Sequence, residues 1–208
     1  MTRPVDMRIV CDMGTEKLTT KLTTRDVLVA PNVFSDFAPG DLYKRLEYEI
    51  GNCGVAEDRL LKLWHGDTHY IADDHTAWKK NAPTFAMVID RVRTFFEMDV
   101  KATRFNWYKD TSQFKPFHHD AAAIKEKQAA TQNFTVAISF GATRDAAFEE
   151  VKSKVVVSMP QPDGYIYAFA KDTNILWKHG ILQDKETRQE GRISVICWGY
   201  VAGIEENM

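Results

Sequence analysis

The sequence predicts an α+β protein in which an antiparallel β-sandwich or jelly roll is backed by N-terminal helices. Helical apolar periodicity is confined to the first hundred residues, and short β-branched or aromatic runs separated by turn signals fill the second hundred. Too little helix lies between these runs for parallel crossover connections, which favours antiparallel pairing. With 208 residues and 44% hydrophobic residues, the chain is expected to form one domain with its own core.

Two amphipathic helices are predicted in the first half. The first lies in PNVFSDFAPGDLYKRLEYEIG, where Ser35 or Asp41 is the expected N-cap and Gly51 ends the helix. The second begins at Pro83 in PTFAMVIDRVRTFFEM. Its apolar residues recur at helical spacing and predict one buried face, formed by Phe85, Val88, Ile89, Val92, Phe95 and Phe96.

Four strands are predicted in the second half, and a poorly apolar segment precedes the core. The first 26 residues hold few large apolar side chains, so we expect a loosely held N-terminal arm (1–26) followed by a single domain (27–208). The strands are β-branched or aromatic and are bounded by turn residues. They are FTVAISF (134–140), KVVVSM (154–159), YIYAFA (165–170) and RISVICWGYV (192–201).

Charge and cysteine content limit the range of functions. The net charge of −2 leaves no basic excess to hold a long phosphate backbone, so any nucleic-acid contact must be local. Cys11, Cys53 and Cys197 are odd in number and form no CxxC pair, which predicts free thiols and an intracellular location, cytoplasm or nucleus. We found no apolar run of membrane-spanning length and no export signal, and we expect a monomer with no membrane contact.

A metal site is predicted from the segment FKPFHHDAAA. Alternate residues of an extended chain face the same side, so His118 and Asp120 point together while His119 points away. The other histidine of the strand-rich half is His179, in NILWKHGIL. Two histidines and one carboxylate with three open coordination positions form the facial triad of non-haem Fe(II) oxygenases. We therefore expect His118, Asp120 and His179 to hold a metal ion and to be the catalytic centre.

A carboxylate anchor is predicted close to this site. Arg192 and Ser194 place a cation and a hydroxyl on the same face of a strand, a combination suited to binding a carboxylate. An iron site beside such an anchor is what a 2-oxo acid cosubstrate requires. In the alternative interpretation, HHD is a polar turn and His179 is a surface residue beside Lys178.

The motif RFNWYKDTSQFKPFHHD resembles the AlkB-like 2-oxoglutarate and Fe(II)-dependent dioxygenases, whose pattern is N-x-Y, a short loop and H-x-D. The resemblance continues through ISFGATRDAAF, which is similar to the family's S-[LF]-G-x-x-R-x-F stretch, and through PDGYIYAF to WKHGI. PNVFSDFAPGDLYKRL is similar to the family's N-terminal opening, so the resemblance covers residues 27 to 202. It implies a double-stranded β-helix, Fe(II) at the predicted triad, and 2-oxoglutarate and O2 as cosubstrates.

The resemblance also assigns cosubstrate residues and shows two departures. It implies that Asn106, Tyr108 and Arg192 bind 2-oxoglutarate, while Ser194 stands where the family usually has Asn. Trp198 occupies the place of the family's second arginine, and we consider Arg188, from the preceding loop, as its substitute. Nucleic-acid repair members tend to carry acidic residues after H-x-D, whereas this chain has three alanines, Ala121, Ala122 and Ala123.

Between the helices, LWHGDTHYIADD crowds Trp64, His65, Asp67, His69 and Tyr70. In the family this region helps to form a lid over the substrate, and an aromatic ring there can stack on a flipped base. We therefore expect Trp64, His65 and Tyr70 to contact substrate, the alternative being a core tryptophan with solvated polar neighbours. The spacing also allows a second metal site, although no strong metal motif accompanies it, at His65, His69 and His75.

The expected activity is oxidative demethylation of N-alkylated bases in single-stranded or short methylated nucleic acid, because SFGATRD is most similar to the nucleic-acid-acting members. One alternative keeps the oxidative chemistry and applies it to a protein side chain or a small molecule, in keeping with the acidic balance and the alanines after Asp120. Another alternative is a non-catalytic β-helix that binds a partner. The intact triad with its anchor argues against this last possibility.

Overall fold

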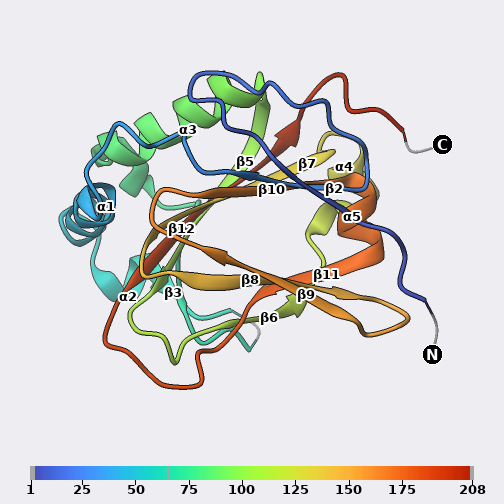
Figure 1. Cartoon of the computed structure of the whole chain (residues 1–208). Helices are drawn as coiled ribbons and strands as arrows, with labels where there is room; N and C mark the ends of the chain where they lie inside the picture. The colour runs from blue at the N-terminus through green and yellow to red at the C-terminus, as the bar shows by residue number, and fades with distance from the viewer. Residues whose placement is uncertain (1–2, 65, 207–208) are drawn as a thin grey trace.

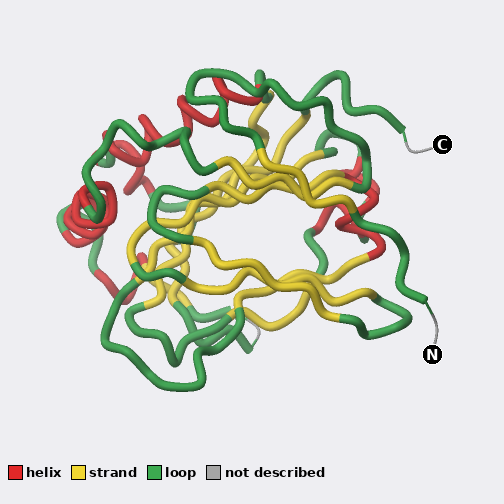
Figure 2. The backbone as a smooth tube through the Cα atoms, viewed as in Figure 1, coloured by secondary structure: helices red, strands yellow, loops and turns green. Residues whose placement is uncertain are grey.

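Two sheets face each other in the computed structural model, which describes residues 3–64 and 66–206 (Figures 1 and 2). The large sheet has the order β1 (Arg8–Cys11), β2 (Asp26–Ala30), β10 (Ile166–Ala170), β7 (Phe134–Gly141), β12 (Arg192–Tyr200), β5 (Asp99–Tyr108), β4 (Tyr70–Ala72) and β3 (Leu61–Lys62). The small sheet has the order β6 (Lys115–His118), β11 (Trp177–Ile181), β8 (Arg144–Glu150) and β9 (Val156–Gln161). The pairs are antiparallel apart from β1 and β2. The predicted jelly-roll core backed by N-terminal helices is confirmed.

Most of the helices are short. The two longest, α1 and α3, cover the outer face of the large sheet (Figure 1). They are α1 (Asp41–Gly51), α2 (Glu57–Leu60), η1 (Ala77–Asn81), α3 (Pro83–Phe96), η2 (Ala121–Ala123), α4 (Glu126–Ala129) and α5 (Lys171–Leu176). None of the helices in the described part of the chain has the length and apolar character needed to cross a membrane.

Both predicted helices are present, with one correction at a cap. Pro83 is the first residue of α3, and all six apolar residues predicted for its face are buried. The N-cap of α1 is Gly40, at φ 75°, rather than Ser35 or Asp41; Asp41 is instead the first helical residue, where a carboxylate is favoured by the helix dipole. The buried Glu49 of α1 accepts hydrogen bonds from two backbone amides in the first turn of α3, so the two helices are joined by a cap as well as by apolar packing.

Strand alternation divides the interior into two cores. On β12, Ile193, Val195 and Cys197 face the helices and belong to the larger core. The alternate residues of β12 face the small sheet, where a second core includes Phe148 and Phe169. The same β12 side chains that point away from the helices therefore border the space between the two sheets.

The four predicted strands correspond to β7, β9, β10 and β12. The segment before residue 27 is held more closely than the sequence predicts. Strand β1 pairs with β2, Leu22 is buried, and Thr23 bridges to Glu205 near the other end of the described chain. Asp12, 1% exposed, accepts hydrogen bonds from the backbone of Gly14 and of two threonines. Backbone pairing, one buried carboxylate and a single buried leucine hold this segment in place, and none of the three produces an apolar periodicity in the sequence.

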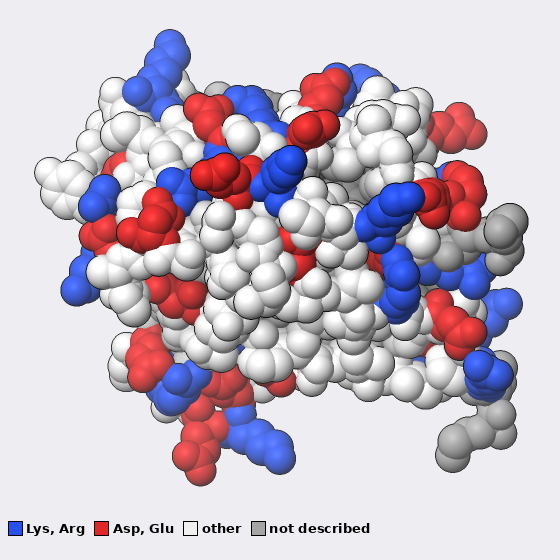
Figure 3. Space-filling view, turned by 45° about the horizontal axis from the view of Figure 1, so that its top comes forward, with Lys and Arg blue, Asp and Glu red and all other residues white. Residues whose placement is uncertain are grey.

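The surface and the thiols agree with the composition. Lysine and arginine alternate with aspartate and glutamate on the face in view in Figure 3, as expected for a chain with 27 basic and 29 acidic residues. The cysteines are free, as predicted: Cys11 is exposed, whereas Cys53 and Cys197 are buried.

Candidate metal centre and pocket

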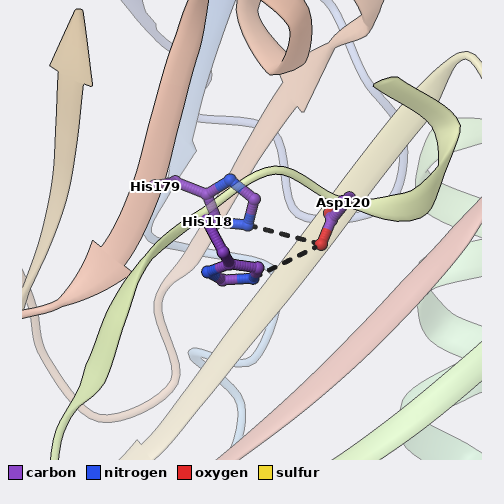
Figure 4. Close-up of side chains that lie close together, drawn as sticks. All are labelled: His118, Asp120 and His179. Carbon is purple, nitrogen blue, oxygen red and sulfur yellow. Dashed lines mark ion pairs between the residues drawn. The ribbon is translucent and has the colours of Figure 1, made fainter. Parts of the chain in front are cut away.

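The predicted triad comes together where β6 meets β11. His118 and His179 are direct partners in the antiparallel pairing of these strands, and Asp120 follows β6. Oδ1 of Asp120 lies 3.6 Å from Nε2 of His118 and 3.5 Å from Nε2 of His179 (Figure 4). One ligand atom from each residue lies within 4.8 Å of the others, and among the described residues this is the one such cluster of histidine, cysteine and acidic side chains.

The two histidines of the HHD segment point in opposite directions, as the alternation predicts. Nδ1 of His118 donates to the carbonyl of Pro116 at 3.0 Å, which leaves the Nε2 lone pair facing Asp120. Nδ1 of His119 donates instead to the carbonyl of Asn174 at 2.6 Å, on the opposite side of the segment. The side chain of Asn174 also accepts from the backbone amide of Asp120. Residue 119 is therefore a structural anchor rather than a ligand.

The carboxylate of Asp120 is held at both oxygens. Oδ1 faces the histidines, while Oδ2 accepts hydrogen bonds from Oγ1 of Thr135 at 3.0 Å and from Nε1 of Trp198 at 2.8 Å. Burial opposes ionisation, but attraction to His179 and His118 prevails and lowers the pKa of Asp120 well below its usual range. Burial also lowers the pKa of His179, against the attraction of Asp120. An anionic carboxylate beside a neutral imidazole is the protonation state that binds a divalent cation.

Gly180 allows the two ligand-bearing strands to approach. A Cβ atom at this position would lie 2.5 Å from the carbonyl oxygen of Lys115 and within 3.3 Å of backbone atoms of Pro116 and Phe117. All of these atoms belong to β6, so no side-chain rotation could relieve the contact. The pairing of β6 with β11 therefore requires glycine after His179.

A pocket, partly open to solvent, extends from the triad along the inner face of the large sheet. Alternate residues of β5 and β12 form one side of it: Arg104, Asn106 and Tyr108 from β5, and Ser194, Ile196 and Trp198 from β12. The structure thus brings the predicted Asn106, Tyr108 and Ser194 into one pocket with the triad.

Arg192 lies just beyond the deep end of this pocket. It is fully buried, its guanidinium carbon is 5.2 Å from the ring centre of Tyr108, and its Nη2 donates to Oγ of Ser139 at 2.7 Å. Its Nε and Nη1 have no hydrogen-bond partner among the described residues. Burial raises the pKa of Tyr108 to about 12, although the charge of Arg192 opposes this shift, so the phenol is a neutral donor. An orphaned buried cation beside a buried phenol fits an anionic ligand.

The sequence reasoning missed a second buried cation, Arg144 of β8. It is 1% exposed, lies 5.9 Å from the ring centre of Tyr108 and is 3.2 Å from Asp184. Burial lowers its pKa, and so does the positive charge of Arg192 nearby, while Asp184 raises it. Arg188, considered as the substitute for a second arginine, is instead 41% exposed and paired with Asp184, away from the pocket lining. Arg144 lies in the SFGATRD stretch, so the motif contained the signal.

The aromatic segment before β4 is distributed over different surroundings. Trp64 is 43% exposed and lies against Arg104 of the pocket lining, at the more exposed end that we call the mouth of the pocket. Tyr70 is the cross-strand partner of Trp107, and both rings lie under the ammonium of Lys109, on the side of β5 away from the pocket. The structure therefore places Trp64 against a residue of the pocket lining, without making it a lining residue, and places Tyr70 away from the pocket. His65 lies outside the described residues.

Asp67 and His69 contact residues of the pocket lining without lining the pocket themselves. His69 is fully buried, stacks on Tyr108 with ring centres 4.3 Å apart, and its Nε2 lies 3.2 Å from Oδ1 of Asn106. Burial lowers the pKa of His69 to about 4. Asp67 binds Nζ of Lys115 at 2.6 Å. His69 is thus committed to Asn106 and Tyr108 and joins no metal cluster among the described residues.

No model of a known protein family matches the sequence, and no curated protein matches it. Among solved structures, the chain is similar to the crystal structure of a Pseudomonas putida prolyl-4-hydroxylase, at 14% sequence identity and a TM-score of 0.48, covering 80% of this chain and 90% of that chain. The function proposed below therefore depends on the residues of this chain.

Proposed function

We propose that the protein is a 2-oxoglutarate- and Fe(II)-dependent dioxygenase. The observation that carries this proposal is a two-histidine, one-carboxylate cluster in a pocket whose lining residue Tyr108 contacts a buried arginine, Arg192, that lacks a full set of partners. The first feature is a ligand set for Fe(II), and the second is an anchor for an anion. A pocket that joins the two is suited to a chelating 2-oxo acid.

His118, Asp120 and His179 would hold the iron, which supplies O2 activation and the oxidation of a C–H bond when it is bound. The chain contributes the preorganisation of these ligands. Pro116 fixes the ring of His118, and Thr135 with Trp198 fixes the carboxylate. Outer partners of this kind orient metal ligands and tune their basicity.

At the deep end, Arg192 would bind the distal carboxylate of 2-oxoglutarate, with the neutral phenol of Tyr108 donating a further hydrogen bond. Asn106 and Ser194 are paired across β5 and β12 and line the pocket between this end and the metal ligands. They would orient the middle of the cosubstrate. These four side chains are buried, which excludes water and strengthens each of their contacts with the cosubstrate.

For the primary substrate we propose an N-alkylated base in single-stranded or short methylated nucleic acid, which would lose its alkyl group by oxidation. The similarity of SFGATRD to the nucleic-acid-acting members supports this substrate, and so does Trp64, an exposed ring at the pocket mouth that could stack on a base. The mixed charges of Figure 3 favour a short substrate over long duplex DNA. The alternative is the same chemistry on a protein side chain or a small molecule, favoured by the alanines of η2 beside the metal ligands.

The deciding experiment measures succinate formation by the Fe(II)-loaded protein with a panel of methylated oligonucleotides, methylated peptides and small molecules. Trp64→Ala should lower oligonucleotide oxidation, because stacking contributes about 1–3 kcal/mol per base. Tyr70→Ala is the matched control, since that ring lies away from the pocket. If only a peptide or small molecule stimulates succinate formation, the nucleic-acid substrate is wrong. If no 2-oxoglutarate is consumed at all, the dioxygenase proposal fails.

A further inference from the structure

Arg104 is a cation in the pocket that the proposed reaction does not use. Its guanidinium contacts two indoles, 5.4 Å from the ring centre of Trp64 and 5.3 Å from that of Trp198. It lines the same pocket as the metal ligands and is half-buried. Among the described residues, no carboxylate forms an ion pair with it, although most other arginines of the described chain have one.

The charges of the pocket show why this matters. Asp120 would be neutralised by the metal ion, and the two carboxylates of 2-oxoglutarate by the metal ion and Arg192. Lys115 is already paired with Asp67. Arg104 is then left as the one positive charge of the described pocket lining with no carboxylate beside it, so an anionic ligand there would gain a favourable Coulombic interaction.

The position of Arg104 separates it from the cosubstrate anchor. Arg192 is the cross-strand partner of Tyr108, whereas Arg104 is the partner of Ile196, further along the same two strands. Trp198, which contacts Arg104, also donates to the metal-binding carboxylate of Asp120. Arg192 and Arg104 therefore lie toward opposite ends of the pocket, and Arg104 is at the more exposed of the two.

The two indoles also determine what Arg104 can bind. Both rings contact the guanidinium through cation–π interactions, which restricts its orientation. The N–H groups at the edge of the planar group remain available, and their fork geometry matches a carboxylate or a phosphate.

We propose that the primary substrate carries an oxyanion, a carboxylate or a phosphate, close to the group that is oxidised, and that Arg104 binds it. This inference deepens the proposed function and rests on it for the identity of the primary substrate. A single guanidinium suits one anionic group, such as the phosphate of one nucleotide or the carboxylate of a small acid, rather than the continuous backbone of a long polyanion.

The test measures binding without turnover, by calorimetry on protein loaded anaerobically with Fe(II) and 2-oxoglutarate. Two matched pairs of probes separate the sources of the anion: N6-methyladenosine 5′-monophosphate against N6-methyladenosine, and benzoate against benzamide. In the wild-type protein we expect at least one anionic probe to bind tenfold or more tightly than its neutral partner, and Arg104→Gln to abolish that difference. Arg104→Lys should restore only part of it, because an ammonium lacks the planar fork.

Arg93→Gln is the control for the loss of one positive charge, since Arg93 lies on α3 and pairs with Asp90. The inference is overturned if neither anion binds at millimolar concentration, or if Arg104→Gln weakens the neutral and anionic probes equally, which would make Arg104 a packing element between the indoles. Consumption of 2-oxoglutarate in air is scored separately. Its absence in the wild-type protein would refute the proposed function while leaving anion binding at Arg104 to be judged on its own.

Discussion

At the deep end of the pocket, Arg192, Tyr108 and Ser139 come from three neighbouring strands of the large sheet, whereas at the mouth Trp64 comes from the chain between β3 and β4. The deep residues are buried and their cross-strand register is continuous, while Trp64 is 43% exposed. A rigid, buried end is suited to the cosubstrate, which is the same in every turnover. A more open end is suited to the primary substrate, which determines specificity. The comparison predicts that substitutions at the deep end and at the mouth affect different ligands.

The metal ligands lie between the two ends of the pocket. Their loss should therefore abolish oxidation whichever ligand, cosubstrate or primary substrate, is varied. We expect His118→Ala, Asp120→Ala or His179→Ala to remove stoichiometric Fe(II) and all oxidation, because two remaining ligands hold the ion too weakly. Metal analysis and succinate formation measure this. His119→Ala is the control, since it loses only a hydrogen bond to Asn174 and should keep the metal. Equal loss of metal at residue 119 would show that the register of the HHD segment is wrong.

Arg192→Ala tests the deep end alone. Removing a buried partner of a carboxylate costs about 3–5 kcal/mol, so the apparent KM for 2-oxoglutarate should rise by roughly two to four powers of ten. Arg188→Ala should change it less than about threefold, because that side chain is exposed and paired with Asp184. If the Arg192 variant changes KM for the primary substrate instead, the two ends have been assigned in reverse.

Trp198→Phe tests whether the mouth is coupled to the metal. The substitution keeps a ring against Arg104 but removes the indole hydrogen bond to Asp120, and outer partners of this kind alter metal affinity by about 10–100-fold. Titration with Fe(II) or a spectroscopic substitute such as Co(II) measures the change. Trp177→Phe is matched to it, since the indole nitrogen of Trp177 is buried without a partner among the described residues. Similar metal affinities in the two variants would show that Trp198 at the mouth does not influence metal binding.

The smallest effect concerns His69, which supports the wall behind Tyr108. Its pKa is about 4 in the folded protein and about 6.5 in an unfolded chain. Between these values the unfolded state binds more protons, so the free energy of unfolding falls as the pH falls. Between about pH 6.5 and 5 this residue should account for a loss of roughly 2 kcal/mol. The free energy of unfolding of His69→Asn, measured in urea, should depend less steeply on pH than that of the wild-type protein, and an unchanged slope would contradict this role of His69.

The triad was predictable because its signal is local. The alternation of His118 and Asp120 follows from two residues of one extended segment, and His179 was the remaining histidine of the strand-rich half. The helices were predictable for a similar reason, since the buried face of α3 repeats within one element. The place of Trp198 beside Asp120 was not, because it depends on the pairing of β12 with β7, which sets Trp198 opposite Thr135.

The same reason explains the residues that were missed or misplaced. Arg144 approaches Arg192 only when the small sheet lies over the large one, and no spacing in the sequence encodes that distance. Tyr70 lies four residues before Asp74 in a polar segment and was expected at the substrate, but its pairing with Trp107 turns it to the other face of β5. A one-residue difference in register decides the face of a sheet.

Gly180 has a consequence for how the metal motif should be defined. A side chain at this position would press on the backbone of β6 and move His118 away from His179 without altering any ligand. Replacing Gly180 by any larger residue would therefore weaken metal binding as the loss of a ligand would. The motif encoded by this chain is therefore H-x-D followed at a distance by H-G, and a sequence that keeps all three ligands but replaces the glycine would specify a different spacing and lose the centre.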